Sequence, residues 1–117
     1  MKKLLLASTF LFLFAFTAFA QQVQSGTFSA NSTTPNYTLD KNSGDRVVTI
    51  EVNYPAPFDK KPHIVLAVSQ LDASTASNIR YDVKAVSVSR DNFTIQIKTW
   101  SDTKILGIAG TWLAISQ

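Results

Sequence analysis

The sequence contains no cysteine, and this absence removes several kinds of chemistry at once. A disulfide framework, a thiol nucleophile and a cysteine-ligated metal site are all excluded. Histidine is nearly absent too, because His63 is the single one among 117 residues, so a metal site that needs two histidines is excluded. We therefore expect no bound metal and no cofactor, and we expect a small core to be supported by assembly.

Charged residues are also few, at 16% of the chain. The first twenty residues hold two of the eleven basic residues, which leaves nine basic against eight acidic residues in the rest. Such a balance gives no basic stripe of the kind that nucleic acid requires, and no charge-based attraction to a membrane surface. Nucleic acid is therefore not an expected partner.

Residues 1–20 have the organisation of a cleaved signal peptide. Lys2 and Lys3 precede an uncharged apolar run over 4–19, and Ala18-Phe19-Ala20 fits a cleavage site. The alternative is a membrane anchor, which needs about 20 apolar residues and is longer than this run. We expect a secreted protein, or one exported across the inner membrane of a bacterium. Its single domain would then span 21–117, with no membrane insertion after cleavage.

Alternation of apolar and polar residues predicts strands in that domain. Phe93, Ile95 and Ile97 fall on one face of an extended chain, and no segment has helical periodicity. Short runs of this kind, separated by polar loops, predict an all-β fold: a six-stranded antiparallel β-sandwich. The predicted strands are 23–28, 47–52, 63–71, 79–89, 93–98 and 107–116.

Three local features of these strands can be predicted further. The run 63–71 is the most apolar after the leader, which predicts a central strand. A change of phase within 79–89 predicts a bulge or bend near Ala85. Asp91 and Asn92 predict a two-residue hairpin turn before the next strand.

No catalytic constellation is present in the sequence. The single His63 follows Pro62 and opens an apolar strand, which does not suit a catalytic triad. A glycine-rich phosphate loop and a calcium-binding loop spacing are both absent. We therefore assign no catalytic residue and expect a protein that is not an enzyme.

Polar groups with one large aromatic gather near the strand ends. Trp100 precedes the polar stretch 101–104 and is either a packing residue at the end of the sandwich or the wall of a binding site. The rigid donor fork of Arg80 suits adjacent sugar hydroxyls, although a surface ion pair with Asp72 or Asp82 is the alternative. An aromatic ring beside charged side chains is typical of sugar recognition.

An ordered set of short motifs over most of 22–117 resembles the H-type lectin domain, the domain of snail agglutinins and of the C-terminal part of discoidins. The motifs are Val23-Gln24-Ser25-Gly26, Gln70-Leu71-Asp72, Asn78-Ile79-Arg80, Val88 to Phe93, Thr99-Trp100 with Thr103-Lys104, and Trp112 before Ala114-Ile115-Ser116. The resemblance implies a six-stranded sandwich, a homotrimer, and calcium-independent binding of galactose and N-acetylgalactosamine.

The resemblance also implies which residues bind the sugar. The family's arginine corresponds to Arg80 and its tryptophan to Trp100, with Ser101 next to it. Leu106 stands where the snail protein has a tyrosine that packs on the sugar. These four positions are candidate carbohydrate-binding residues.

An acidic residue completes the family's site, and its position here is open. Ungapped alignment places Ser43 there, while Asp45 lies two residues later and Asp40 three residues earlier. We take Asp45 as the candidate acidic residue.

The resulting hypothesis is a secreted lectin that acts in adhesion or agglutination through trimer avidity. Leu106 and Ser43 favour an alternative, a structural or protein-interaction sandwich that has lost the sugar site. A non-catalytic targeting module for a separate enzyme or toxin is a third hypothesis.

Overall fold

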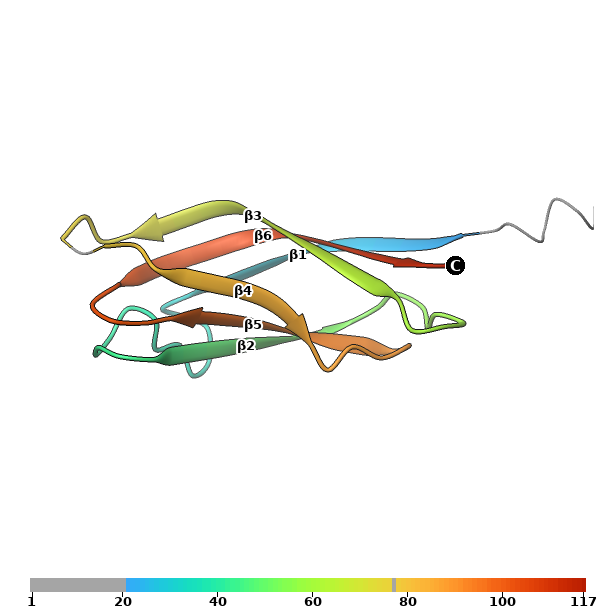
Figure 1. The fold of residues 1–117 in the computed structure, drawn as a ribbon, viewed down its shortest axis with the longest axis horizontal. Coiled ribbons are helices and arrows are strands. Elements are labelled where there is room, and N and C mark those ends of the chain that lie inside the picture. The colour runs from blue at the N-terminus through green and yellow to red at the C-terminus, as the bar shows by residue number, and fades with distance from the viewer. Residues whose placement is uncertain (1–20, 77) are drawn as a thin grey trace, which may run out of the picture.

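The computed structural model describes residues 21–76 and 78–117 and is all-β (Figure 1). The predicted signal peptide, residues 1–20, lies outside the described residues. Six strands are formed: β1 (Gln22–Asn31), β2 (Arg46–Asn53), β3 (His63–Ala73), β4 (Tyr81–Val86), β5 (Asn92–Thr99) and β6 (Ile105–Ser116). Every strand pairing is antiparallel, so the predicted fold class is confirmed.

The strands form two three-stranded sheets that face each other as a sandwich (Figure 1). One sheet has the order β1-β6-β3, and the other has the order β2-β5-β4. The loop between β3 and β4 and the loop between β5 and β6 lie at one end of the sandwich, and the chain terminus after β6 lies at the other end. We call the first of these the loop end.

The core lies between the sheets and is built on the alternation of β5. Phe93, Ile95 and Ile97 are fully buried, as their spacing predicts. Phe93 meets Trp112 of β6 edge to face, with ring centroids 5.5 Å apart. Trp112 lies directly over Gly26 of β1, where an added Cβ would come within 2.6 Å of its indole nitrogen. The strands therefore approach closely at the one position in β1 that has no side chain.

The predicted central position of the most apolar strand is wrong. β3 is an edge strand, and β6 occupies the centre of its sheet. Val65 and Val68 of β3 remain exposed, at 53% and 36% of their surface. β3 therefore has the apolar composition of a central strand, although no other part of the described chain covers its outer edge or its outer face.

The predicted length of the fourth strand is also wrong. β4 ends at Val86, because Ser87 adopts a left-handed conformation with φ of 53° and turns the chain. The register of β4 is continuous to that point, so no bulge lies at Ala85. The connection to β5 spans residues 87–91 and replaces the predicted two-residue turn. The Ser89 hydroxyl accepts hydrogen bonds from the backbone N–H groups of Asp91 and Asn92 within it.

The outer faces of the two sheets differ in charge. Strands β1 and β6 contain no charged residue, and their sheet presents Val23, Val65, Leu113 and Ile115 outward. The outer face of β2-β5-β4 instead carries Glu51, Asp82, Lys84 and Lys98. The outer face of β1-β6-β3 is therefore uncharged except for Asp72 of β3 at the loop end, whereas the outer face of β2-β5-β4 carries charge on all three strands.

A search of the described residues for a helix long and apolar enough to cross a membrane finds none.

Candidate functional site

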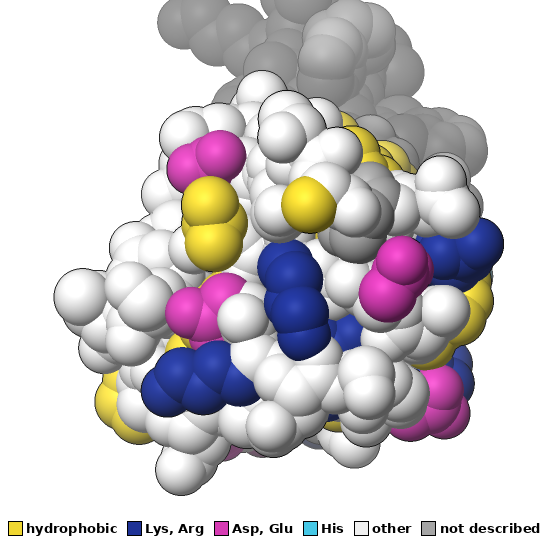
Figure 2. Space-filling model, turned by 90° about the vertical axis from the view of Figure 1, so that its left-hand side faces the viewer, with side chains coloured by type: hydrophobic (Ala, Val, Ile, Leu, Met, Phe, Trp, Pro, Cys, Tyr) yellow, Lys and Arg dark blue, Asp and Glu magenta, His cyan; other side chains and the backbone are white. Residues whose placement is uncertain are grey.

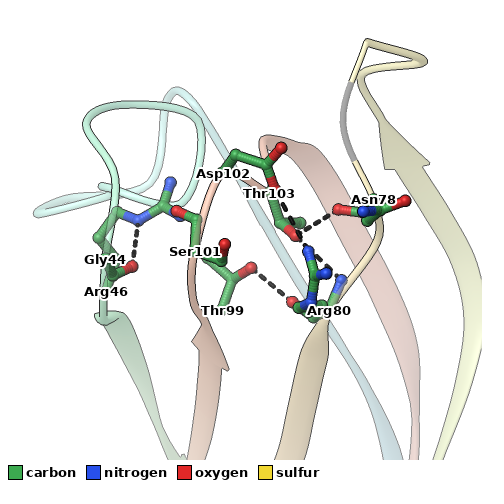
Figure 3. A network of polar contacts seen from close by, with 8 residues as sticks. All are labelled: Gly44, Arg46, Asn78, Arg80, Thr99, Ser101, Asp102 and Thr103. Atoms are coloured by element: carbon green, nitrogen blue, oxygen red, sulfur yellow. Dashed lines mark hydrogen bonds and ion pairs between the residues drawn. The ribbon is translucent and has the colours of Figure 1, made fainter.

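Arg46 fixes the geometry of the loop end. Its side chain is buried at 6% exposure, and its guanidinium group donates only to backbone carbonyls. The acceptors are Lys41 at 2.9 Å, Gly44 at 3.0 Å, Ser101 at 3.0 Å and Leu39 at 3.4 Å. These bonds join the loop before β2 to the loop after β5 (Figure 3). A planar group with five donors can satisfy all four carbonyls at once, whereas an ammonium group has three donors at a single nitrogen.

Ser101 turns the chain directly after Trp100. Its φ of 60° is left-handed, an uncommon conformation for a residue that is not glycine. Its carbonyl accepts hydrogen bonds from Arg46 and from the backbone N–H of Gly44 at 2.9 Å. The surrounding bonds therefore hold a strained turn in place, and strain of this kind concentrates at functional sites.

An open pocket of about 480 Å³ lies beside this turn, on the outer face of β2-β5-β4. We call it the Trp100 pocket, and its lining residues are Asp45, Tyr81, Asp82, Lys98 and Trp100. The register explains the grouping, because Asp82 of β4 pairs with Lys98 of β5. Lys98 also forms an ion pair with Asp45, with its Nζ 3.4 Å from a carboxylate oxygen.

The Trp100 pocket combines flat apolar surface with charge. Trp100 is partly buried, so it both packs and lines the pocket, and Tyr81 exposes 37% of its surface. Asp45 and Asp82 supply acceptors, and Lys98 supplies donors. The two rings can pack on the apolar face of a ligand while the charged groups bind its hydroxyls. Small-molecule sites commonly combine an apolar lining with a small number of well-placed polar groups in this way. The predicted site residues Trp100 and Asp45 are brought together here.

Arg80 lies at the same end, immediately before β4. Its guanidinium group forms an ion pair with Asp102 at 3.3 Å, with 37% of the arginine side chain exposed. Arg80 therefore does form a surface ion pair, the alternative considered for it, but its partner is Asp102 and not Asp72 or Asp82. Asp102 is exposed as well, so this pair contributes little to stability and leaves other guanidinium donors facing solvent.

Two threonines hold the backbone of Arg80. The Thr99 hydroxyl donates to its carbonyl at 2.6 Å, and the Thr103 hydroxyl accepts from its N–H at 3.0 Å. Thr103 also donates to the carbonyl of Asn78 (Figure 3). Both threonines are fully buried. They tie the start of β4 to the 99–103 segment, which is why the Arg80 side chain reaches Asp102.

Leu106 lies elsewhere in the structure. It is on β6 and lines a separate hollow of about 230 Å³ on the other sheet, together with Asn31, Gln70 and Asp72. The structure therefore does not bring Leu106 to the Trp100 pocket. Ser101 remains next to Trp100 but does not line the pocket. Its carbonyl instead accepts a hydrogen bond from Arg46 and so holds the turn beside the pocket.

The open acidic position has different surroundings for each candidate. Asp45 lines the Trp100 pocket, whereas one carboxylate oxygen of Asp40 is buried without a hydrogen-bond partner among the described residues. Asp40 lies instead near Tyr37, whose hydroxyl donates to the carbonyl of Ile105 at 2.6 Å. Burial, followed by the negative charges of Asp40 and Asp72, raises the pKa of Tyr37 to about 12.

The sequence did not identify Tyr81, Asp82 and Lys98 as pocket residues. Alternation placed Asp82 and Lys98 on outward faces, but the register that sets them opposite each other requires the fold. Arg46 gave no signal, since one arginine at the start of a strand does not differ from any exposed one.

The loop end does not have charge of a single sign. Figure 2 looks onto this end and shows basic and acidic side chains interspersed over it. Among the described residues, no group of three or more histidine or acidic side chains could hold a metal ion. The site therefore has the mixed polarity suited to a neutral polar ligand.

Comparisons with known proteins identify a family from one match and a fold from others. A model of the H-type lectin domain matches residues 49–115. A protein of Fuscovulum blasticum, described as ATP synthase subunits region ORF 7, is 34% identical over 75 residues. That alignment covers 64% of this chain and 65% of the relative, so the chain spans just under two thirds of that protein.

Solved structures of discoidin II from Dictyostelium discoideum are similar in fold. The native recombinant protein superposes with a TM-score of 0.74 and the wild-type protein with 0.75, each at 20% identity. The superpositions cover 84% of this chain but only 38% and 37% of the discoidin chains. The described sandwich therefore corresponds to part of a longer protein in this comparison.

Proposed function

The chain belongs to the H-type lectin domain family, a family of carbohydrate-binding lectins, and on this premise we propose that its sugar site is the Trp100 pocket. The observation that carries the proposal is the meeting of Trp100 and Tyr81 with three charged side chains in one open pocket. The buried Arg46 holds the adjoining turn, so the pocket is formed before any ligand binds.

The ligand that we propose is a terminal galactose or N-acetylgalactosamine. Such a sugar has an apolar C–H face on the side opposite its axial hydroxyl, and that face would pack on Trp100 and Tyr81. Asp45 and Asp82 would accept hydrogen bonds from adjacent hydroxyls, and Lys98 would donate to a ring or hydroxyl oxygen. Arg80 would add donors at the rim. The ligand is bound and not transformed.

A glycan array of the purified chain, followed by calorimetry on the best ligand, tests the site. We expect Trp100→Ala to weaken binding about tenfold or more, since the stacked ring is lost. The matched control is Thr49→Ala, an exposed position on the same sheet that does not line the pocket. Leu106→Ala should also leave the affinity unchanged. A folded chain that binds no glycan would contradict the sugar proposal.

The alternative, a protein-interaction sandwich without a sugar site, has one supporting observation. Leu106 exposes 46% of its surface and lies on a different sheet from Trp100, so the position that holds the sugar-packing ring in the snail protein contributes nothing to the pocket. If Arg80→Ala and Trp100→Ala both leave surface adhesion intact in a folded protein, this alternative gains.

We further propose that the chain is secreted, assembles as a homotrimer, and acts in adhesion or agglutination. The outer face of β1-β6-β3, which is uncharged except for Asp72 at the loop end, supports self-association, because an exposed apolar sheet face of this kind is commonly an interface. A single monosaccharide site makes few contacts, so several sites in one assembly would supply the binding strength through avidity.

A further inference from the structure

A second pocket lies at the end of the sandwich opposite the loop end. Its volume is about 300 Å³, and its lining residues are Lys60, Lys61, His63, Ile115, Ser116 and Gln117. We call it the Lys60 pocket. We propose that it binds a tetrahedral oxyanion, a phosphate or sulfate group, independently of the sugar site.

The backbone around the Lys60 pocket is held by hydrogen bonds from two strands of one sheet, the central strand β6 and the edge strand β1. The Ser116 hydroxyl of β6 donates to the carbonyl of Lys60 at 3.2 Å. Gln22 of β1 accepts a hydrogen bond from the N–H of Asp59 at 3.0 Å. His63 opens β3 directly opposite Ile115 in the register. The basic residues therefore extend from a segment whose position is fixed by β1 and β6.

The charged side chains that line this pocket are all basic, and the negative group among its lining residues is the main-chain carboxylate of Gln117, where the given sequence stops. Lys60, Lys61 and His63 line it, and no aspartate or glutamate does. The ion pairs among the described residues are Arg80 with Asp102 and Lys98 with Asp45, so neither lysine is neutralised there. The adjacent strands β1 and β6 carry no charge, and the carboxylate of β3, Asp72, lies at the loop end. Asp59 is a neighbour in the chain but is not part of the lining.

An oxyanion is the ligand that this chemistry favours. Two ammonium groups supply several N–H donors, and charge-assisted bonds to oxyanions are stronger than neutral ones. The imidazole of His63 can donate a further hydrogen bond. No tryptophan, tyrosine or phenylalanine among the described residues lines this pocket, in contrast to the Trp100 pocket, so a neutral sugar lacks the large apolar ring on which its C–H face would pack.

His63 provides a direct test because it is the only histidine in the chain. The chain is prepared without a histidine tag, and its imidazole NMR signals are followed during titration with sodium phosphate and then sulfate, against sodium chloride at equal ionic strength. We expect a saturable shift with the oxyanions that weakens at least tenfold in the Lys60→Gln/Lys61→Gln variant. The control variant, Lys41→Gln/Lys84→Gln, removes the same charge elsewhere and should titrate like the parent.

A second experiment, sedimentation with lipid vesicles, distinguishes a free phosphate from a lipid headgroup as the ligand. Phosphatidylcholine vesicles with and without phosphatidylglycerol are sedimented with each variant. If lipid phosphate is the source, binding needs the anionic lipid and falls about fivefold for each lysine removed. Phosphate shifts without vesicle binding would support a soluble oxyanion as the ligand.

Three results would overturn the proposal. They are the absence of a saturable shift, an equal shift in both double variants, and vesicle binding without any phosphate titration at His63. Because the two pockets share no residue, Trp100→Ala should leave the phosphate titration unchanged, so failure of the sugar site and failure of the anion site are separable.

Discussion

Arg46 shows how a single buried side chain can organise a site without lining it. Its guanidinium group satisfies carbonyls from the two loops that meet at the loop end, and one of these is the carbonyl of the strained residue Ser101. Trp100 owes its position to this arrangement, because the turn begins directly after it. A residue outside the pocket is therefore expected to control both folding and binding.

The first prediction concerns Arg46→Lys. Lysine keeps the charge but cannot reach the same carbonyls with one ammonium group, so we expect a loss of about 2–4 kcal/mol of unfolding free energy. Urea unfolding measures it, and glycan affinity should fall in the fraction that remains folded. Lys84→Arg, an exposed exchange on β4, is the control and should change stability by less than about 0.5 kcal/mol. Equal stability of the two variants would show that the carbonyl contacts contribute little.

The second prediction concerns Tyr37 and pH. Its pKa is raised from 10.0 to about 12, so the folded protein keeps the phenol proton at a pH where the unfolded chain has lost it. The associated stabilisation is complete below pH 10 and is lost as the pH rises through about 12. Between these values the parent should lose about 2 kcal/mol more unfolding free energy than Tyr37→Phe.

Urea unfolding at several alkaline pH values measures this difference. Ultraviolet absorbance of tyrosinate provides a second readout, since Tyr37→Phe should remove one group from the latest part of the titration. Parallel pH profiles for the parent and Tyr37→Phe would contradict the assignment, because Tyr54, whose pKa burial also raises, is present in both.

At the scale of strands, the sequence correctly predicted burial where it depends only on the alternation of apolar and polar residues along one strand. The alternation of β5 predicted a buried face, and Phe93, Ile95 and Ile97 are fully buried. The sequence was misleading for β3, because apolar composition does not distinguish a central strand from an edge strand whose outer residues, such as Val65 and Val68, are exposed. Its edge position depends on how β6 enters between β1 and β3, which is a property of topology.

The candidate site was predictable only in part for a related reason. Trp100 and Asp45 were identified from the resemblance and from their place at strand ends, and they line one pocket. Tyr81 could not be assigned to it, because it joins the pocket only through the pairing of β4 with Thr99 of β5. Leu106 was assigned by alignment, which ignores that β6 belongs to the opposite sheet. Contacts across strands are non-local, so local pattern does not encode them.

For the whole molecule, the contrast between the two outer faces leads to a prediction about assembly. Val65 on the uncharged face and Val47 on the charged face are similarly exposed, at 53% and 42%. If the uncharged face joins copies of the chain, Val65→Glu should convert the assembly to monomers, because a carboxylate would be buried without a partner. Val47→Glu should leave it unchanged. Sedimentation velocity measures both.

Agglutination provides a functional readout of the same pair. The monomeric Val65→Glu variant should keep its single-site glycan affinity and lose agglutination, because avidity needs several sites in one particle. A parent chain that sediments as a monomer at every concentration, or a Val65→Glu variant of unchanged size, would contradict an interface on this face.

The strand β6 joins the two ends of the molecule. It begins at Ile105, just after the loop that carries Trp100, and it ends at Ser116 in the Lys60 pocket. Twelve extended residues span about 40 Å, and both neighbours of β6 pair with it along most of this length. The strand β6 therefore fixes the distance between the two pockets. A sugar held at one end and an oxyanion held at the other would be kept at a separation that the hydrogen-bonded ladder sets, with no hinge between them.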